Sequence, residues 1–340
     1  MKDTILIWGA GAIGGTIGAN LVRAGINVQM VDIEPDHARI CSDVGLSLEG
    51  PVQNFTLRVP CVTPGELDGV YKRIVLAVKS PATAESVSAI ISHLDSDGFI
   101  LSAQNGLNEH YIAEKVGEDR VMGCFVNFGA DWLEPGKILY GNRGAFVIGE
   151  IDGSIKSRTR EMHKLMSILE PKVVLTNNIM GYLWGKMCYG AMLFATALTG
   201  ESMAANFADP TRTPILTKIG KEVLTVASAE GIRPEGFDGF DPSAFMSSAS
   251  PDAASECMAK MALFNLNTAK THSGIHRDIV VRRRPTEVDY QPGVIVKIAA
   301  SHSIETPFLK RLIELVHDLE KGRREVSPEV FHQLNLTGVL

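Results

Sequence analysis

The sequence lacks the features that mark several specialised classes of protein. It has five cysteines among 340 residues, and none are spaced as C-x-x-C, so we expect neither a disulfide framework nor a zinc site. The net charge of −6 shows no excess of basic residues, so nucleic acid is not an expected ligand. The most apolar stretch, residues 191–198, is too short to span a bilayer, and no signal peptide precedes the first apolar run. We therefore expect a cytoplasmic protein with neither membrane nor nucleic acid as a partner.

What the sequence does contain is a glycine-rich turn at its start. Residues 4–8 predict a buried strand and residues 13–24 a helix, and the turn between them reads GxGxxG. In this setting the first glycine allows a tight turn, the second lets a pyrophosphate approach, and the third lets the helix pack on the strand. A tight turn without a ligand is the alternative. We predict dinucleotide binding at the helix N-terminus by Gly9, Gly11, Ala12, Ile13 and Gly14.

Asp32 indicates which dinucleotide is bound. It ends the second predicted strand, residues 27–31, where a carboxylate can accept both hydroxyls of the adenosine ribose and would repel a 2′-phosphate. The sequence therefore predicts NAD, with NADP less favoured. Arg39 and Lys79 are the cations that could still accept a phosphate.

The first half of the chain alternates short apolar runs with helical stretches, which is typical of a parallel sheet with crossover helices. Lys79 and Asn105 follow predicted strands, at the sheet edge where such folds bind ligands. We predict an α/β domain of the Rossmann type over residues 1–175. Residues 46–48 and 55–59 are expected to form an antiparallel excursion. Further strands are expected at 73–79 and 98–103, and strands at 121–128, 137–140 and 145–149 are expected to complete the main sheet.

After residues 172–177 the apolar period changes from two to nearly four, which predicts an all-helical second domain over residues 176–340. The junction between the domains is a natural place for a substrate cleft. Helices are expected at 179–199, 213–230, 255–268, 287–302 and 307–321.

These residues resemble ketopantoate reductases, which are NAD(P)-dependent two-domain oxidoreductases of the 6-phosphogluconate dehydrogenase-like type. The likeness rests on GAGAIGG, AVKS (77–80), QNGL (104–107), YLWGKM (182–187) and RRPTEVDY (283–290). It implies a homodimer and five site residues. Lys186 would donate a proton to the keto oxygen, and Glu287 would hold this lysine and the substrate hydroxyl. Asn105 would lie between cofactor and substrate, Lys79 would contact the cofactor, and Ser273 would hold the substrate carboxylate.

The sequence departs from the family pattern beside Lys186. This sequence has Gly190 where the family usually has a substrate-binding asparagine. Four residues later, Phe194 stands where the family often has another asparagine. Because an amide is lost and space is gained, we expect a divergent member whose substrate is not ketopantoate itself and is either bulkier or held by other groups. His276 or its neighbour His272 could replace the missing donor, and Arg277 could bind a carboxylate bidentately. No metal is expected, because His272 and His276 have no third ligand at a suitable spacing.

Lys186 stands among apolar residues of its predicted helix. Loss of hydration disfavours the charged form of a lysine, whereas a carboxylate such as Glu287 favours it, and this competition can produce a useful acid or base. Gly181, Gly185 and Gly190 in the same helix suggest close approach of another backbone, a ligand or a partner subunit.

The segment that carries Glu287 has helix-start signals. Thr286 and Asp289 have the spacing of a capping box, so we expect Asp289 to cap and Glu287 to face the cleft. Pro292 should kink the helix or delay its regular start.

The main prediction is an NAD-linked oxidoreductase that interconverts a hydroxy acid and its keto acid, with Lys186 exchanging the proton. Two alternatives stay open. One is a dinucleotide-sensing protein that has lost catalysis, which Gly190 and Phe194 would permit. The other is an imine- or opine-forming dehydrogenase on the same architecture.

Overall fold

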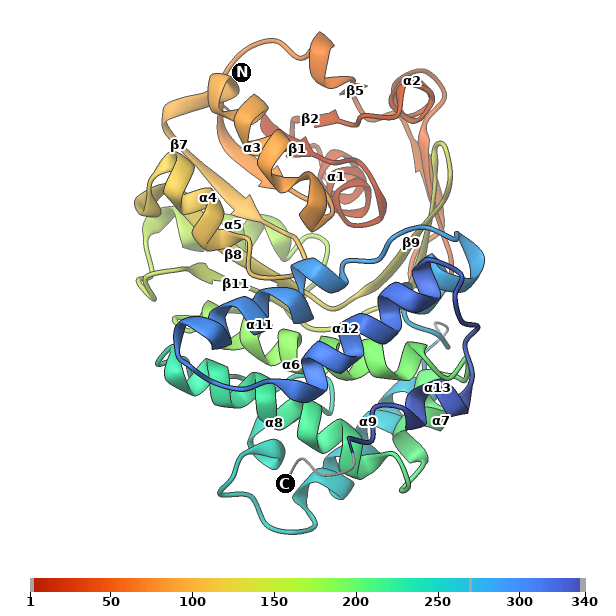
Figure 1. Cartoon of the computed structure of the whole chain (residues 1–340). Coiled ribbons are helices and arrows are strands. Elements are labelled where there is room, and N and C mark those ends of the chain that lie inside the picture. The colour runs from red at the N-terminus through yellow and green to blue at the C-terminus, as the bar shows by residue number, and fades with distance from the viewer. Residues whose placement is uncertain (1–2, 269–270, 337–340) are drawn as a thin grey trace. The chain divides into compact units, whose positions relative to one another are not determined.

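The computed structural model describes residues 3–268 and 271–336. The chain divides into two compact units, Met1–Ile179 and Met180–Leu340, drawn from red to yellow-green and from green to blue in Figure 1. The first is an α/β unit and the second is helical, so the predicted fold class is confirmed. The predicted boundary near residue 175 lies in β12, a few residues before this division. No helix in the described part of the chain combines the length and the hydropathy that a membrane span requires.

The main sheet of the first unit has the strand order β12-β11-β8-β7-β6-β1-β2-β5. The strands from β8 to β5 pair in parallel, whereas β11 runs antiparallel to β8. Their bounds are β1 Ile5–Trp8, β2 Val28–Val31, β5 Cys61–Val62, β6 Tyr71–Leu76, β7 Leu94–Ser102, β8 Val121–Val126, β11 Phe146–Glu150 and β12 Val174–Leu175.

Successive residues of a strand face opposite sides of a sheet. In β1, Ile5 and Ile7 belong to one apolar core while Leu6 and Trp8 belong to another, and all four are buried. A run of apolar residues rather than an alternating pattern is what a parallel strand covered on both faces requires. The helices of this unit are α1 Ala12–Arg23, α2 Pro35–Asp43, α3 Thr83–Ile90, α4 Glu109–Val116 and α5 Ser157–Met166.

A second sheet of order β4-β3-β10-β9 covers α1. The predicted antiparallel pair is confirmed as β3 Leu46–Glu49 and β4 Phe55–Leu57. The prediction that residues 137–140 complete the main sheet is wrong. That stretch lies in β10 Lys137–Asn142, which pairs in parallel with β3 and antiparallel with β9 Gly129–Glu134. An added Cβ at Gly15 of α1 would lie 2.5 Å from Ile138 Cδ1, so α1 and this sheet pack at very close range.

His37 joins this second sheet to the glycine-rich loop. The buried ring receives hydrogen bonds at Nδ1 from Gly136 N (3.0 Å) and Trp132 Nε1 (3.3 Å). Because Nδ1 faces two donors, Nε2 carries the hydrogen and donates it to Ala10 O at 2.9 Å. The loop after β1 is thus held in place by a side chain of α2.

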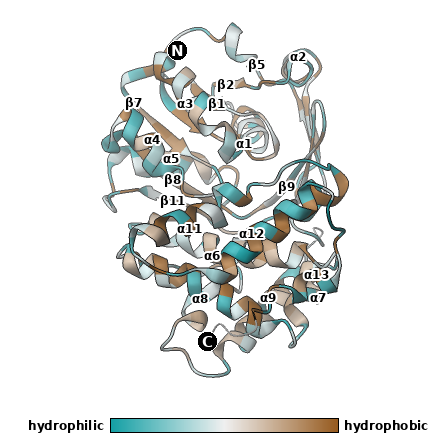
Figure 2. Cartoon of the chain, viewed as in Figure 1, coloured by the Kyte–Doolittle hydropathy of each residue, from teal (hydrophilic) through white to brown (hydrophobic). Residues whose placement is uncertain are grey.

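The predicted long helices of the second unit are confirmed. Figure 2 shows hydrophobic and hydrophilic residues alternating along α12, whose buried residues recur every three to four positions. The short α7, α10 and α13 were not predicted. The bounds are α6 Ile179–Ala197, α7 Met203–Ala208, α8 Thr213–Ala229, α9 Ala253–Leu266, α10 Gly274–His276 leading into a π turn Arg277–Val281, a 3-10 turn Val288–Tyr290, α11 Pro292–Ser301, α12 Pro307–Glu320 and α13 Pro328–His332.

Pro292 delays the helix predicted at 287–302, as expected, because α11 begins at this proline. The capping role predicted for Asp289 is wrong. Its carboxylate lies 3.1 Å from His317 Nε2 on α12, and it therefore ties the start of α11 to a neighbouring helix.

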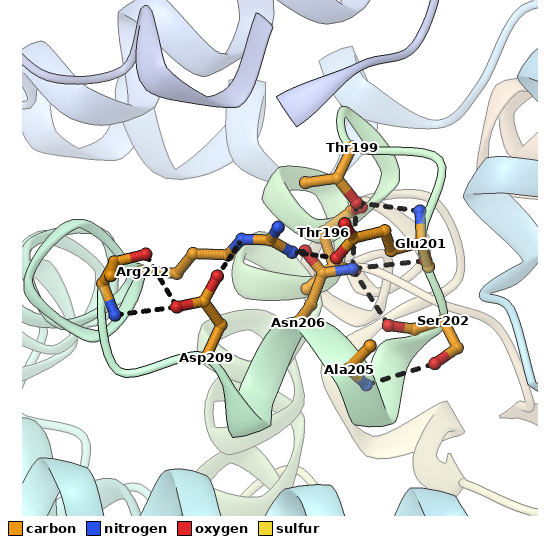
Figure 3. Close-up of polar contacts among 9 residues, drawn as sticks. Thr196, Thr199, Glu201, Ser202, Ala205, Asn206, Asp209 and Arg212 are labelled. Carbon is orange, nitrogen blue, oxygen red and sulfur yellow. Dashed lines mark hydrogen bonds and ion pairs between the residues drawn. The ribbon is translucent and has the colours of Figure 1, made fainter. Parts of the chain in front are cut away.

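A buried polar cluster fixes the connection from α6 through α7 to α8 (Figure 3). Arg212 Nη1 donates to Glu201 Oε2 at 2.7 Å and to Asn206 Oδ1 at 2.6 Å, and Nε lies 3.1 Å from Asp209 Oδ2. Asn206 in turn donates to Thr199 Oγ1. A buried guanidinium is tolerated only when acceptors surround it, and this cluster provides them.

The side chain of Glu222, which belongs to α8, caps the N-terminus of α12. Its carboxylate accepts hydrogen bonds from Phe308 N (2.9 Å) and Leu309 N (2.8 Å), and burial nevertheless raises the pKa of this carboxyl to about 7. Between its ordinary value of 4.5 and about 7 the folded state binds more protons at this site than the unfolded chain. This contribution to stability is therefore full below about pH 4.5 and declines as the pH rises to about 7.

We expect the Glu222→Gln variant to lack this decline, because glutamine does not titrate. The measurement is the melting temperature of wild type and variant at intervals from pH 4.5 to 8. The wild type should lose stability relative to the variant as the pH rises. Parallel profiles across this range would show that Glu222 titrates normally.

Candidate functional site

The three glycines of the GxGxxG motif lie in three different environments. Gly9 has φ of +98°, which favours glycine. An added Cβ at Gly14 would lie 1.9 Å from Gly9 O, so this position must be glycine for the helix to pack on the loop. At Gly11 an added Cβ would meet no atom of the described residues within 4 Å, and its φ of −67° suits any residue. The fold does not require glycine at position 11, and open space over the backbone is what an approaching phosphate requires.

The start of α1 is suited to an anion. Gly11 is the N-cap and offers no side-chain acceptor, and within the described residues no side chain caps the helix and no acidic residue stands in its first turn. Gly11, Ala12 and Ile13 are partly exposed, whereas Gly14 is buried. The first N–H groups of a helix need acceptors, and a pyrophosphate can supply them.

Asp32 lies directly beside this loop. Its Oδ2 accepts a hydrogen bond from Ala10 N at 2.8 Å and its Oδ1 accepts one from Glu34 N at 3.0 Å. A carboxylate has further lone pairs, so Asp32 can still accept ribose hydroxyls while it is held in this position. Arg39, which could have accepted a 2′-phosphate, lies 3.3 Å from Asp36 on the surface of α2.

Lys79 and Asn105 follow β6 and β7, which are neighbouring parallel strands, and both side chains are exposed. Ser80 Oγ donates to Asn105 O at 2.6 Å and Asn108 Nδ2 donates to the same oxygen at 2.7 Å. These bonds join the loops after the two strands. The α/β unit therefore brings the glycine loop, Asp32, Lys79 and Asn105 to the carboxyl edge of one sheet, as predicted from their positions at the ends of strands.

In the helical unit, Lys186 is half-buried on α6 and Glu287 is 8% exposed just before the 3-10 turn at 288–290. The close backbone approach predicted for this helix is confirmed at Gly185. An added Cβ there would lie 2.2 Å from Glu235 O, and Glu235 N donates to Gly181 O at 2.9 Å. The glycines next to Lys186 thus allow another segment of the chain to lie directly on α6.

Gly190 does not leave open space beside Lys186. An added Cβ there would lie 3.2 Å from Gln291 Oε1, so the Gln291 side chain occupies the volume that a larger residue would fill. The expectation of gained space is therefore wrong at this position. Gly190 is four residues after Lys186, so Gln291, at the end of the segment that carries Glu287, contacts α6 one helical turn beyond Lys186. Phe194, at the second departure from the family pattern, is fully buried in the core.

Ser273 is buried and serves as the N-cap of α10, where its Oγ accepts a hydrogen bond from His276 N at 3.2 Å. The rings of His272 and His276 lie 4.4 Å apart. Burial lowers the pKa of His276 and the neighbouring His272 lowers it further, so the ring is neutral near pH 7. Burial also lowers the pKa of the half-buried Arg277, which remains a cation at that pH. Among the described residues no cluster of side chains could hold a metal ion.

Sequence reasoning missed two polar residues of this region. Gln291 gave no signal because its partner position is a hundred residues earlier. Asp278 is buried and lies 3.2 Å from Arg282 Nη1 and 2.9 Å from Arg284 Nε, so two of the three consecutive arginines neutralise it. The spacing of Asp278 and Arg282 on one helical turn could have indicated that pair.

The glycine environments predict different outcomes for two alanine variants. Gly11→Ala should melt at the wild-type temperature but bind NADH at least about tenfold more weakly, because the methyl group fills the space needed by phosphate. Gly14→Ala should lower the melting temperature, because its methyl group collides with Gly9 O. Thermal melts and NADH titration by fluorescence measure both. If Gly11→Ala bound NADH as tightly as the wild type, the proposal that this loop binds the cofactor would be wrong.

Comparison with known proteins identifies both units. The family model described as Ketopantoate reductase PanE/ApbA matches residues 5–153, and that described as Ketopantoate reductase PanE/ApbA C terminal matches residues 178–320. The 2-dehydropantoate 2-reductase of Streptococcus pyogenes serotype M3 is 23% identical over 318 residues, which covers 93% of this chain and 97% of that protein. The corresponding protein of Archaeoglobus fulgidus is 26% identical over 319 residues, covering 94% and 98%.

Solved structures share the fold over almost the whole chain. D-mandelate dehydrogenase in its ternary structure with NADH and anilino(oxo)acetate has a TM-score of 0.82 at 22% identity, covering 94% of this chain and 99% of that one. The dimeric ketopantoate reductase of Staphylococcus aureus has a TM-score of 0.72 at 17% identity, covering 94% and 100%. With family models matched across both of its units, the chain belongs to the ketopantoate reductase family.

Proposed function

We propose that the protein is an NAD-dependent oxidoreductase that interconverts a 2-hydroxy acid and its 2-oxo acid. The observation that carries the proposal is that the buried Glu287 belongs to a segment whose Gln291 contacts α6 at Gly190, one turn beyond Lys186. A cation on α6 and an acid on the segment that contacts this helix are the pair that proton exchange with a substrate oxygen requires. Family membership and the open glycine loop support the cofactor class.

In the proposed mechanism each residue has one task. When bound, the nicotinamide supplies or accepts hydride at the carbon that carries the substrate oxygen. The ammonium group of Lys186 gives a proton to this oxygen during reduction, and the amine takes it back during oxidation. The buried carboxylate of Glu287 stabilises the charged lysine and accepts a hydrogen bond from the substrate hydroxyl.

The remaining site residues bind and orient. Asn105 would hold the substrate oxygen next to the cofactor, and Lys79 would contact the dinucleotide. Arg277 would bind the substrate carboxylate, with Ser273 and the neutral His276 as hydrogen-bonding groups beside it. Because Ser273 Oγ already caps α10, it would donate its own hydrogen to the carboxylate.

The relatives support a 2-oxo acid as the substrate class. The curated proteins are 2-dehydropantoate 2-reductases, and the D-mandelate dehydrogenase structure holds anilino(oxo)acetate, which also carries an oxo group next to a carboxylate. We propose a substrate other than 2-dehydropantoate, since Gly190 and Phe194 provide no amide on α6. We also propose a homodimer, as in the dimeric Staphylococcus aureus protein.

Lys186→Ala tests the proposed mechanism. Loss of a general acid typically costs a factor of 10² to 10⁴, so we expect kcat to fall by roughly 1,000-fold while the Kd for NADH stays within about twofold of wild type. Lys297→Ala, on the exposed side of α11, is the matched control and should keep full activity. Turnover by Lys186→Ala at a rate close to wild type would refute the assignment.

Asp32 makes a separate prediction about cofactor choice. The kcat/KM ratio for NADH over NADPH should exceed about 10 in the wild type, because the carboxylate accepts ribose hydroxyls and repels a 2′-phosphate. Asp32→Asn should lower this ratio, because the amide carries no charge. Steady-state kinetics with both cofactors give the ratio, and a wild type that prefers NADPH would disprove the role given to Asp32.

A further inference from the structure

The side-chain amide of Gln291 lies next to Gly190 of α6. It is the one neighbour, within the described residues, that a side chain at Gly190 would meet within 4 Å. The residue is half-buried, and in the described part of the chain its amide group makes no hydrogen bond with protein. Its backbone is fixed as the N-cap of α11, because Gln291 O accepts hydrogen bonds from Val294 N (3.1 Å) and Ile295 N (3.3 Å).

An amide offers two donor hydrogens and one acceptor oxygen. Neither amide atom of Gln291 is among the fully buried side-chain atoms that lack a partner, so the amide reaches solvent and is open to a polar ligand. Gln291 is placed four residues after Glu287 and against α6 one turn beyond Lys186, which are the two groups assigned to the reacting oxygen.

We propose that Gln291 is a specificity-determining residue whose amide hydrogen-bonds a hydroxyl or carboxylate oxygen of the hydroxy acid. This inference rests on the proposed function and deepens it. The amide reaches the site from the start of α11 instead of from α6, and it approaches the substrate from a different direction than a side chain at position 190 would.

The glycine at position 190 allows the Gln291 amide to take this position. A Cβ at position 190 would lie 3.2 Å from Gln291 Oε1, so the amide would have to shift by a few tenths of an ångström to make room for it. The two positions therefore compete for one volume, and glycine at 190 is the condition for glutamine at 291 to act. Their substitutions should consequently be non-additive.

The test uses the 2-oxo acid that the wild-type enzyme reduces best in a panel. Gln291→Met keeps the length of the side chain but removes both donors and the acceptor. We expect KM for this substrate to rise about tenfold, with kcat within threefold and the Kd for NADH unchanged, as for the loss of one hydrogen bond to substrate. Tyr290→Phe, which removes an exposed hydroxyl from the adjacent residue, is the matched control and should leave KM unchanged.

Gly190→Ala should raise KM by a similar factor, because its methyl group displaces the amide. The double variant Gly190→Ala with Gln291→Met should be no worse than either single variant. If Gln291→Met fails to fold, Gln291→Glu takes its place, and its negative charge should raise KM for an anionic substrate more than tenfold.

The outcomes separate this inference from the function on which it rests. If the wild type reduces no 2-oxo acid, the proposed function fails. If the wild type is active but the Gln291 variants keep its KM for every acid in the panel, only the role of Gln291 is overturned. Additive effects in the double variant would also overturn the competition between positions 190 and 291.

Discussion

The proposed proton exchange depends on one packing contact, in which Gln291, just before α11, lies against α6 at Gly190. Several bonds hold this segment. Thr286 N and Oγ1 both donate to Glu320 Oε1 on α12, at 2.7 and 2.6 Å, and Asp289 pairs with His317 on the same helix. Pro292 then sets where α11 begins. Glu287 lies between the anchor at Thr286 and the contact of Gln291 with α6, and its buried position follows from both.

The nucleotide-binding unit uses the same principle of fixing a backbone with distant side chains. Ala10 is the centre of the glycine loop, and both of its backbone groups are engaged: Asp32 accepts from its N–H, and His37 donates to its carbonyl. The loop is therefore ordered before a dinucleotide arrives, which reduces the entropy lost on binding. Its glycines complete the arrangement, because two of them are required by the fold and Gly11 leaves space for the ligand.

Local patterns in the sequence predicted much of this, and contacts between distant residues account for the errors. The β1 to α1 turn, the position of Asp32 and the start of α11 at Pro292 each depend on neighbouring residues. The sheet to which β10 belongs depends on its pairing with β3, some ninety residues earlier, and the partner of Asp289 is His317 on another helix. The space beside Gly190 was misjudged for the same reason, because Gln291 fills it from a hundred residues away. No periodicity or motif within one element contains such information.

The central claim is that the protein moves hydride between a nicotinamide and the carbon next to a carboxylate. The most direct measurement supplies NADH deuterated at both C4 positions together with a panel of 2-oxo acids, and follows the products by mass spectrometry. The account predicts that at least one 2-hydroxy acid appears with a single deuterium at C2, in an amount equal to the NADH consumed. Tight binding of NADH without deuterium in any hydroxy acid would contradict it.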